Sequence, residues 1–145
     1  MGRHGSCWIV FSTCILSVTA LADYPEASVL DAAEVIEVVT RDTDGDRRQT
    51  KVWVVVVDGD AYLRTNGSVW LENLRRDPEL LLLVEGSEFE AQAEEIPSDV
   101  ILEKVDRASQ EKYGWQESLI HPFRTKRPEI LKLTPRSSPA PEAPR

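Results

Sequence analysis

Cysteine and histidine are scarce in this sequence of 145 residues, which contains two of each. Both cysteines, Cys7 and Cys14, lie in the first apolar stretch, and His121 is the only histidine beyond it. A structural zinc site takes about four ligands, mostly cysteine and histidine, and a disulfide framework needs paired cysteines. The rest of the chain therefore predicts no metal site and no thiol chemistry. The sequence also lacks a G-x-S-x-G motif, which argues against a serine hydrolase that would use His121 as its base.

A long apolar stretch occurs only once, from Cys7 to Leu21, after a basic start and before the first acidic residue, Asp23. This stretch is shorter than the roughly 20 apolar residues of a transmembrane helix. A basic start, a short apolar stretch and small residues before a cleavage point are typical of a secretory signal peptide. We predict that residues 1–22 are cleaved after Ala22 and that the mature chain is secreted or periplasmic. An uncleaved anchor is the alternative.

Basic residues are outnumbered, with 17 Lys and Arg against 25 Asp and Glu, and the formal net charge is −8. This balance argues against nucleic acid as a partner and against binding to anionic membranes once the signal is removed. The length fits one domain, which we place at residues 35–135. We expect residues 23–34 to be a loose lead-in and the Pro- and Ser-rich residues 136–145 to be a disordered tail.

Short apolar runs separated by turn residues predict a mostly β chain. Asp44-Gly45 and Asp58-Gly59 are hairpin signals, and they indicate three consecutive antiparallel strands, the second of which contains a continuous apolar run. Strands are expected at residues 35–40, 50–57, 61–65, 80–84, 88–94 and 128–133, and helices at 69–76 and from 98 to about 114. Apolar and polar residues alternate strictly over 88–94, which predicts a strand with one buried and one wet face. We therefore predict an α+β fold, a small antiparallel closed or split barrel of about six strands with two helices.

The pattern Asp42-x-Asp44-x-Asp46 resembles the beginning of a calcium-binding loop. Arg47 stands where such a loop needs glycine, and Trp53 stands where it needs glutamate. A hairpin turn is therefore the better interpretation of these three aspartates.

The segment Arg64-Thr65-Asn66-Gly67-Ser68 carries the strongest binding signal. It joins a predicted strand to a predicted helix, and the free N–H groups of a helix N-terminus suit phosphate. Thr65 and Ser68 offer hydroxyl donors, Gly67 lets a ligand approach the backbone, and the Arg64 guanidinium can hold phosphate through two hydrogen bonds. The alternative is an ordinary capped helix after a turn, with Arg64 in solvent.

Tryptophan side chains could stack on a flat ring. Trp53 lies in a valine-rich strand and is expected in the core. Trp70, in the first turn of the predicted helix, is the better candidate for ligand contact, with core packing as the alternative. Trp115 fits either role.

Three segments read VWVVVVDGDAYLRT, WLENLRRDPELLLLVEG and RTKRPEILKLTP. In this order they resemble the flavin-binding split barrels, a superfamily that includes pyridoxamine-phosphate oxidases and deazaflavin-dependent nitroreductases, over about residues 35–135. Trp70, Asn73-Leu74, Pro78 and Arg127-Pro128 look more like the nitroreductase branch, and the oxidases usually have lysine in place of Trp70. The motif KYGW is similar to uncharacterised members of the superfamily.

The resemblance implies a homodimeric barrel with FMN or a deazaflavin in the groove between its subunits. It assigns the cofactor to the loop 64–68, above all to Arg64, Thr65 and Ser68, and to Lys51 on a preceding strand. The chain would then be an oxidoreductase whose cofactor carries the hydride or electron. The alternative is a non-enzymatic exported binding domain on the same fold, with an unknown ligand.

Overall fold

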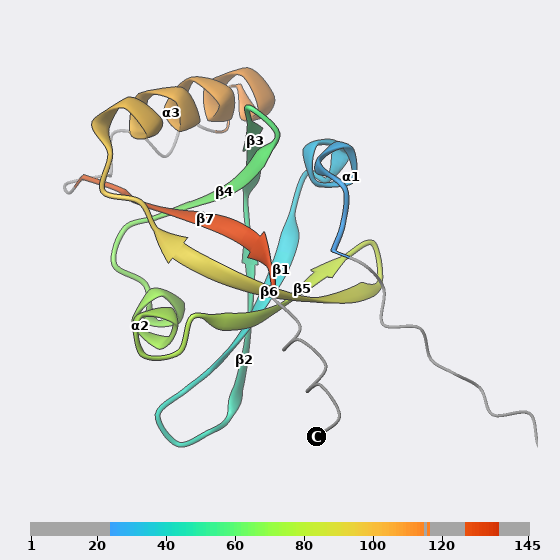
Figure 1. Cartoon of the computed structure of the whole chain (residues 1–145), viewed down its shortest axis with the longest axis vertical. Coiled ribbons are helices and arrows are strands. Elements are labelled where there is room, and N and C mark those ends of the chain that lie inside the picture. Colours follow the sequence, from blue (N-terminus) through green and yellow to red (C-terminus); the bar gives the residue numbers. More distant parts are fainter. Residues whose placement is uncertain (1–23, 115, 117–126, 137–145) are drawn as a thin grey trace, which may run out of the picture.

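A computed structural model describes residues 24–114, 116 and 127–136 of the chain. The predicted signal peptide, nearly all of the predicted tail, Trp115 and His121 lie outside the described residues, so the statements about them stay predictions. The described residues form one antiparallel sheet and three helices (Figure 1).

Seven strands pair in the order β2-β1-β5-β6-β7-β4-β3 within the described part of the chain, and every pair is antiparallel. They are β1 (Ile36–Arg41), β2 (Arg47–Val52), β3 (Val54–Val57), β4 (Asp60–Thr65), β5 (Glu79–Val84), β6 (Ser87–Glu95) and β7 (Glu129–Pro135). The predicted fold class, an α+β split barrel that is mostly β, is confirmed, with one strand more than the expected six.

Trp53 interrupts the strand that the sequence predicts over residues 50–57. β2 pairs with β1 and β3 pairs with β4, so two pieces separated by one residue lie at opposite ends of the strand order. The sheet must therefore curl until its two edges meet at Trp53, which produces the barrel. Both predicted hairpins form, β1–β2 and β3–β4, but the predicted middle strand is not continuous, because the apolar run changes its pairing partner at Trp53.

Three helices pack against this sheet (Figure 1). The helices α2 (Val69–Arg76) and α3 (Asp99–Tyr113) confirm the two that were predicted, and the Ser98 side chain caps α3. The helix α1 (Ala27–Ala32) lies in the expected lead-in, but its Leu30 is 1% exposed and packs in the core. In the part of the chain that the structure describes, none of the helices is long and apolar enough to cross a membrane.

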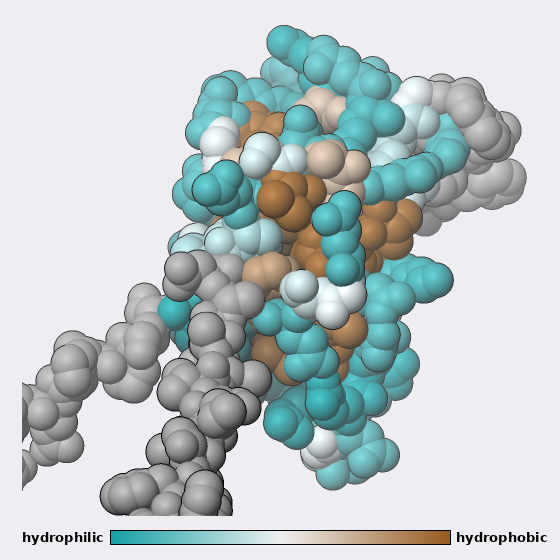
Figure 2. All heavy atoms as spheres, turned by 90° about the vertical axis from the view of Figure 1, so that its right-hand side faces the viewer, coloured by the Kyte–Doolittle hydropathy of each residue, from teal (hydrophilic) through white to brown (hydrophobic). Residues whose placement is uncertain are grey.

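Apolar side chains form two clusters, one on each face of the sheet. The larger cluster fills the barrel, and its Leu63 and Leu82 are fully buried. The predicted alternation along β6 is confirmed, since Ala91 and Ala93 join that interior cluster. The second cluster lies outside β3, β4 and β7, beneath α3, and contains Val55, Tyr62, Val105, Tyr113 and Ile130. On the side that carries α1 and the β5–β6 turn, apolar side chains reach the surface between hydrophilic ones (Figure 2).

Tyr113, at the end of α3, holds the bend between β2 and β3. Its ring stacks on Trp53 with ring centres 4.5 Å apart, and its hydroxyl accepts the Val54 N–H at 3.1 Å. The neighbouring Lys112 Nζ donates to the carbonyl oxygens of Val54 at 2.9 Å and of Leu30 at 3.1 Å. Burial raises the pKa of Tyr113 to about 12 and lowers the pKa of Lys112. The first two residues of the KYGW motif therefore stabilise the closure of the barrel.

Candidate functional site

The loop before α2 brings two of the predicted site residues together. The Thr65 hydroxyl donates to the Ser68 hydroxyl at 2.9 Å, and the Ser68 side chain does not bond to a backbone N–H of its own helix. The first intrahelical bond runs from the Glu72 N–H to the Ser68 carbonyl at 3.3 Å, so the N–H groups before it have no intrahelical partner. Asn66 and Gly67 are exposed, and Gly67 has a φ of +65°, which a side chain would strain. The arrangement suits a small anion.

Arg64 does not lie in this loop cluster. Successive side chains of a strand point to opposite faces, and Leu63 points into the barrel, so Arg64 points outward. There it forms an ion pair with Asp106 of α3 and keeps a side-chain exposure of only 8%. The guanidinium is therefore not in solvent, as the alternative interpretation had it, and its ion pair helps to attach α3.

Lys51 lies on β2, where it is exposed and directly opposite Glu37 on β1. β2 pairs with β1, whereas Thr65 belongs to β4, which pairs with β3 and β7. Trp70 is 6% exposed and packs in the interior cluster with Leu71 and Leu74, so the structure favours the core-packing alternative for its ring. In one protomer, Trp70 therefore offers no open face on which a ligand could stack.

A buried polar network beside α2 was not predicted as part of the site. Asn73 is 3% exposed, and its amide nitrogen donates to the Thr40 hydroxyl at 3.0 Å and to Asp42 Oδ1 at 2.7 Å. Arg48 donates two hydrogen bonds of 2.8 Å to the same Asp42 carboxylate and, ahead of Asn73, lowers its pKa. The Gly45 N–H bonds to the Asp42 carbonyl at 2.9 Å, as in a hairpin turn. The network attaches α2, and so the loop before it, to the β1–β2 hairpin.

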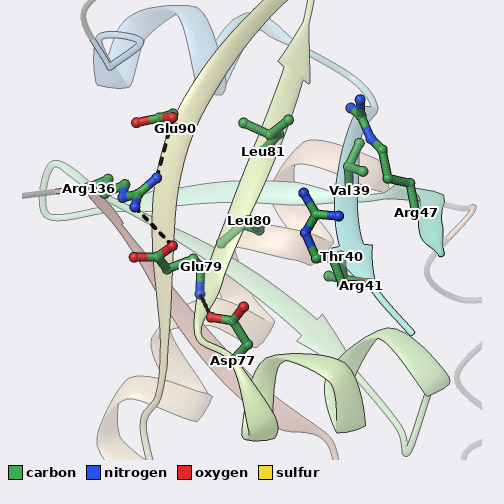
Figure 3. A pocket seen from close by; sticks show the side chains of 10 residues that line it. All are labelled: Val39, Thr40, Arg41, Arg47, Asp77, Glu79, Leu80, Leu81, Glu90 and Arg136. Carbon is green, nitrogen blue, oxygen red and sulfur yellow. Dashed lines mark hydrogen bonds and ion pairs between the residues drawn. The ribbon is translucent and has the colours of Figure 1, made fainter. Parts of the chain in front are cut away.

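A hollow of about 220 Å³ lies on the outer face of β1 and β5 (Figure 3). Val39 and Leu81 line it, Arg41 stands on one side, and Glu79 stands on the other. Arg136 reaches Glu79 at 3.1 Å, and it also reaches Glu90 on β6 at 3.4 Å. The hollow thus has an apolar floor between a basic and a mainly acidic wall, a feature that no short sequence motif marked.

A second hollow, of about 270 Å³, lies where β6 leads into α3. Glu129 lines it, and one of its carboxylate oxygens is buried without a hydrogen-bond partner in the described part of the chain. Arg127, from the RTKRPEILKLTP segment, also lines this hollow and forms an ion pair with Asp99 in the first turn of α3. This exposed pair links the segment before β7 to the start of α3 at the surface.

Several solved structures share the predicted split-barrel fold. The conserved hypothetical protein Rv2991 from Mycobacterium tuberculosis is 24% identical, with a TM-score of 0.64 over 76% of this chain and 78% of that chain. A putative pyridoxamine 5'-phosphate oxidase from Listeria innocua is 15% identical, with a TM-score of 0.53 over 76% and 90%. An F420-H2 dependent reductase, FDR-A, is 11% identical, with a TM-score of 0.55 over 70% and 94%.

At these identities the likeness shows the fold alone, the split barrel of pyridoxamine-phosphate-oxidase-like proteins. HutZ, a heme storage protein from Vibrio cholerae, shares that fold, with 13% identity and a TM-score of 0.59 over 77% of this chain and 87% of its own. No curated protein matches the sequence significantly. A family model does match, over residues 26–133, a range that includes α1. The chain therefore belongs to the family described as "Uncharacterized protein conserved in bacteria (DUF2255)".

Proposed function

We propose that this protein binds a flavin-type cofactor, FMN or a deazaflavin, and acts as an oxidoreductase outside the cytoplasm after cleavage of residues 1–22. The observation that carries the proposal is the Thr65–Ser68 hydroxyl pair at the N-terminus of α2, on a fold shared with an F420-H2 dependent reductase and a putative pyridoxamine 5'-phosphate oxidase. Phosphate is the group that such a helix start accepts best.

The residues present fit the phosphate of such a cofactor in part. Thr65 and Ser68 supply hydroxyl donors, the first turn of α2 supplies backbone N–H groups, and Asn66 and Gly67 leave the loop open to solvent. The cofactor, when bound, supplies the hydride or electron transfer. The chain's own part is to bind and orient it, because no described side chain in this loop is a general acid or base.

Three of the predicted residues could contact the cofactor only with a second protomer or after a rearrangement, namely Arg64, Lys51 and Trp70. Arg64 would have to exchange Asp106 for phosphate, and Trp70 is covered by the core of its own chain. In the proposed homodimer, with the cofactor between subunits, exposed Lys51 can reach a ligand without any such exchange. We therefore rank Thr65 and Ser68 first, Lys51 second, and Arg64 and Trp70 last.

A non-enzymatic exported binding domain is the second candidate. The engagement of Arg64 by Asp106 and the burial of Trp70 favour it, since both leave fewer groups for an FMN-like cofactor. Its fold also occurs in a heme storage protein. A ligand other than flavin would then occupy the proposed groove.

Visible absorption and binding of added cofactors test the proposal. We expect the wild-type protein to bind FMN or F420. Ser68→Ala should weaken FMN by about 10- to 100-fold, the effect of a charged hydrogen bond, and leave riboflavin, which lacks the phosphate, unchanged. Ser98→Ala, at the start of α3, is the matched control and should alter neither. A protein that binds neither FMN nor F420 contradicts the proposal, and a heme band alone favours the second candidate.

A further inference from the structure

The second hollow, of about 270 Å³, lies where β6 leads into α3, beside the start of β7 (Figure 1). Its apolar lining residues are Ile96, Pro97, Leu102, Pro128 and Ile130. Ile96 and Leu102 are only partly buried against the second cluster, so both keep apolar surface that a ligand can cover. Pockets for drug-sized ligands measure about 300–1,000 Å³, so this hollow suits a smaller molecule.

Three charged side chains are among the described residues that line this hollow, Glu95, Arg127 and Glu129. Glu95 accepts two hydrogen bonds from Arg75 of α2, at 3.0 Å and 2.8 Å. Arg127 forms its ion pair with Asp99 of α3. Two of the three charges are therefore balanced by an opposite charge of the same chain.

Glu129 carries the third charge. It is the first residue of β7 and the register partner of Thr65, the last residue of β4, so it lies at one end of the barrel. Within the part of the chain that the structure describes, its carboxylate forms no ion pair, and its Oε2 is buried without a hydrogen-bond donor. A buried acceptor without a donor costs free energy, so such a group calls for an explanation.

We propose that this hollow binds a small organic cation, a primary ammonium on a short apolar body, whose N–H groups donate to the Glu129 carboxylate. The ammonium supplies the opposite charge and the hydrogen-bond donor that the carboxylate lacks. The last torsion of a glutamate side chain is soft and roughly two-fold, so either oxygen can turn toward the ligand. The apolar body lies against Ile96 and Leu102.

Other classes of ligand fit the hollow less well. Among the described residues, no group of three or more His, Cys, Asp or Glu side chains could hold a metal ion. An anion would meet the carboxylates of Glu95 and Glu129, and the only cation beside it, Arg127, is engaged by Asp99. A neutral ligand would leave the Glu129 charge unbalanced. The inference goes beyond the proposed function, since neither a flavin nor the Thr65–Ser68 pair takes part in it.

Titration of the full mature chain with n-butylammonium at neutral pH, followed by NMR of the backbone amides, tests the inference. The shifts should be confined to the residues around the hollow. Glu129→Gln keeps the shape of the side chain and removes its charge, so it should weaken binding by about tenfold or more, the effect of a charged hydrogen bond. n-Butanol and butyrate, which match the probe in length, should bind the wild type at least about tenfold more weakly.

The matched control is Glu88→Gln, which removes an exposed carboxylate at the opposite end of β6 and should leave binding unchanged. Leu102→Phe, which fills the hollow from α3, should also weaken binding, and it decides if Glu129→Gln does not fold.

A wild type that does not bind the probe, equal binding by Glu129→Gln, or equal binding of n-butanol overturns the inference. A chain that binds n-butylammonium but neither FMN nor F420 contradicts the proposed function alone. A chain that binds FMN but not n-butylammonium contradicts the cation site alone.

Discussion

The two halves of the outer face use their polar groups differently. In the covered half, formed by α3 and by the strands beneath it (β3, β4 and β7), Tyr113 and Lys112 bond to backbone atoms at the bend, and Arg64 pairs with Asp106. The open half is the outer face of β2, β1, β5 and β6, where Arg136 pairs with Glu79 and Glu90. Arg41 has no side-chain partner there in the described part of the chain, and the Arg47–Glu88 contact is long and exposed. Groups in the covered half therefore stabilise the fold, whereas the exposed Arg41 and Arg47 side chains of the open half contribute little to it.

The largest effect should come from removing the side chain that holds the bend. Tyr113→Ala deletes the ring stacked on Trp53 and leaves the Val54 N–H without its partner. We expect the free energy of unfolding to fall by about 3–5 kcal/mol, as for other large aromatic residues in cores. Chemical denaturation measures it, with Arg47→Ala on the open half as the control, which should change little. A loss of under about 1 kcal/mol would show that the bend between β2 and β3 does not depend on the Tyr113 side chain.

A pH series sharpens the contribution of the Tyr113 hydroxyl. Burial raises its pKa from the ordinary 10 to about 12. A raised folded pKa means that the stabilisation is complete below pH 10 and is lost as the pH rises toward 12. Denaturation midpoints between pH 8 and 12 should fall less steeply in Tyr113→Phe than in the wild type. Equal slopes would refute the assignment.

At neutral pH, Tyr24→Phe is the matched control for Tyr113→Phe. Burial, and then Asp60, raises the pKa of Tyr24 to about 12 as well, but its hydroxyl has no hydrogen-bond partner in the described residues. Tyr113→Phe should lower the free energy of unfolding by about 1–2 kcal/mol, because the Val54 N–H is left unpaired. Tyr24→Phe should leave it unchanged or raise it.

The sequence predicts those features of the fold that depend on residues close together in the chain. The Asp-Gly turns, the Ser98 start of α3 and the alternation along β6 are local, and each is confirmed. The break at Trp53 depends on Tyr113, sixty residues later, and no property of the valine run itself marks it. The short α1 was missed because its only buried side chain is Leu30.

The residues of the candidate site also divide into those whose contacts follow from the local sequence and those whose contacts depend on the fold. Thr65 and Ser68 lie three residues apart around a turn, so their contact follows from local geometry. The destination of Arg64 depends on Asp106, which the fold brings beside it from α3. The burial of Trp70 could have been predicted from the sequence. Trp70, Leu71 and Leu74 form one apolar stripe on α2, and such a stripe indicates core packing rather than ligand contact.

A smaller effect is expected where α2 meets the β1–β2 hairpin. Asn73→Ala leaves the Thr40 hydroxyl and the Asp42 carboxylate without their buried amide donor. We expect a loss of about 1–3 kcal/mol in the free energy of unfolding, the range for a buried group left unsatisfied. Thermal denaturation measures it, and Arg48→Ala, which removes an exposed partner of the same Asp42, should cost less. The reverse order would mean that the ion pair, not the buried amide, attaches the hairpin.

The smallest effect should come from removing the exposed ion pair of Lys104. Burial, and not position on α3, determines how much a polar group stabilises the fold. Lys104 lies on α3 and donates to Asp58 at 2.7 Å, but the two side chains are 46% and 72% exposed. Lys104→Ala should leave the unfolding midpoint within measurement error, because exposed ion pairs add little. Lys112→Ala, on the same helix, should lower it clearly, since two carbonyl oxygens lose a half-buried donor. If the two variants were equally harmless, the bend would be held by the Tyr113 ring and hydroxyl alone.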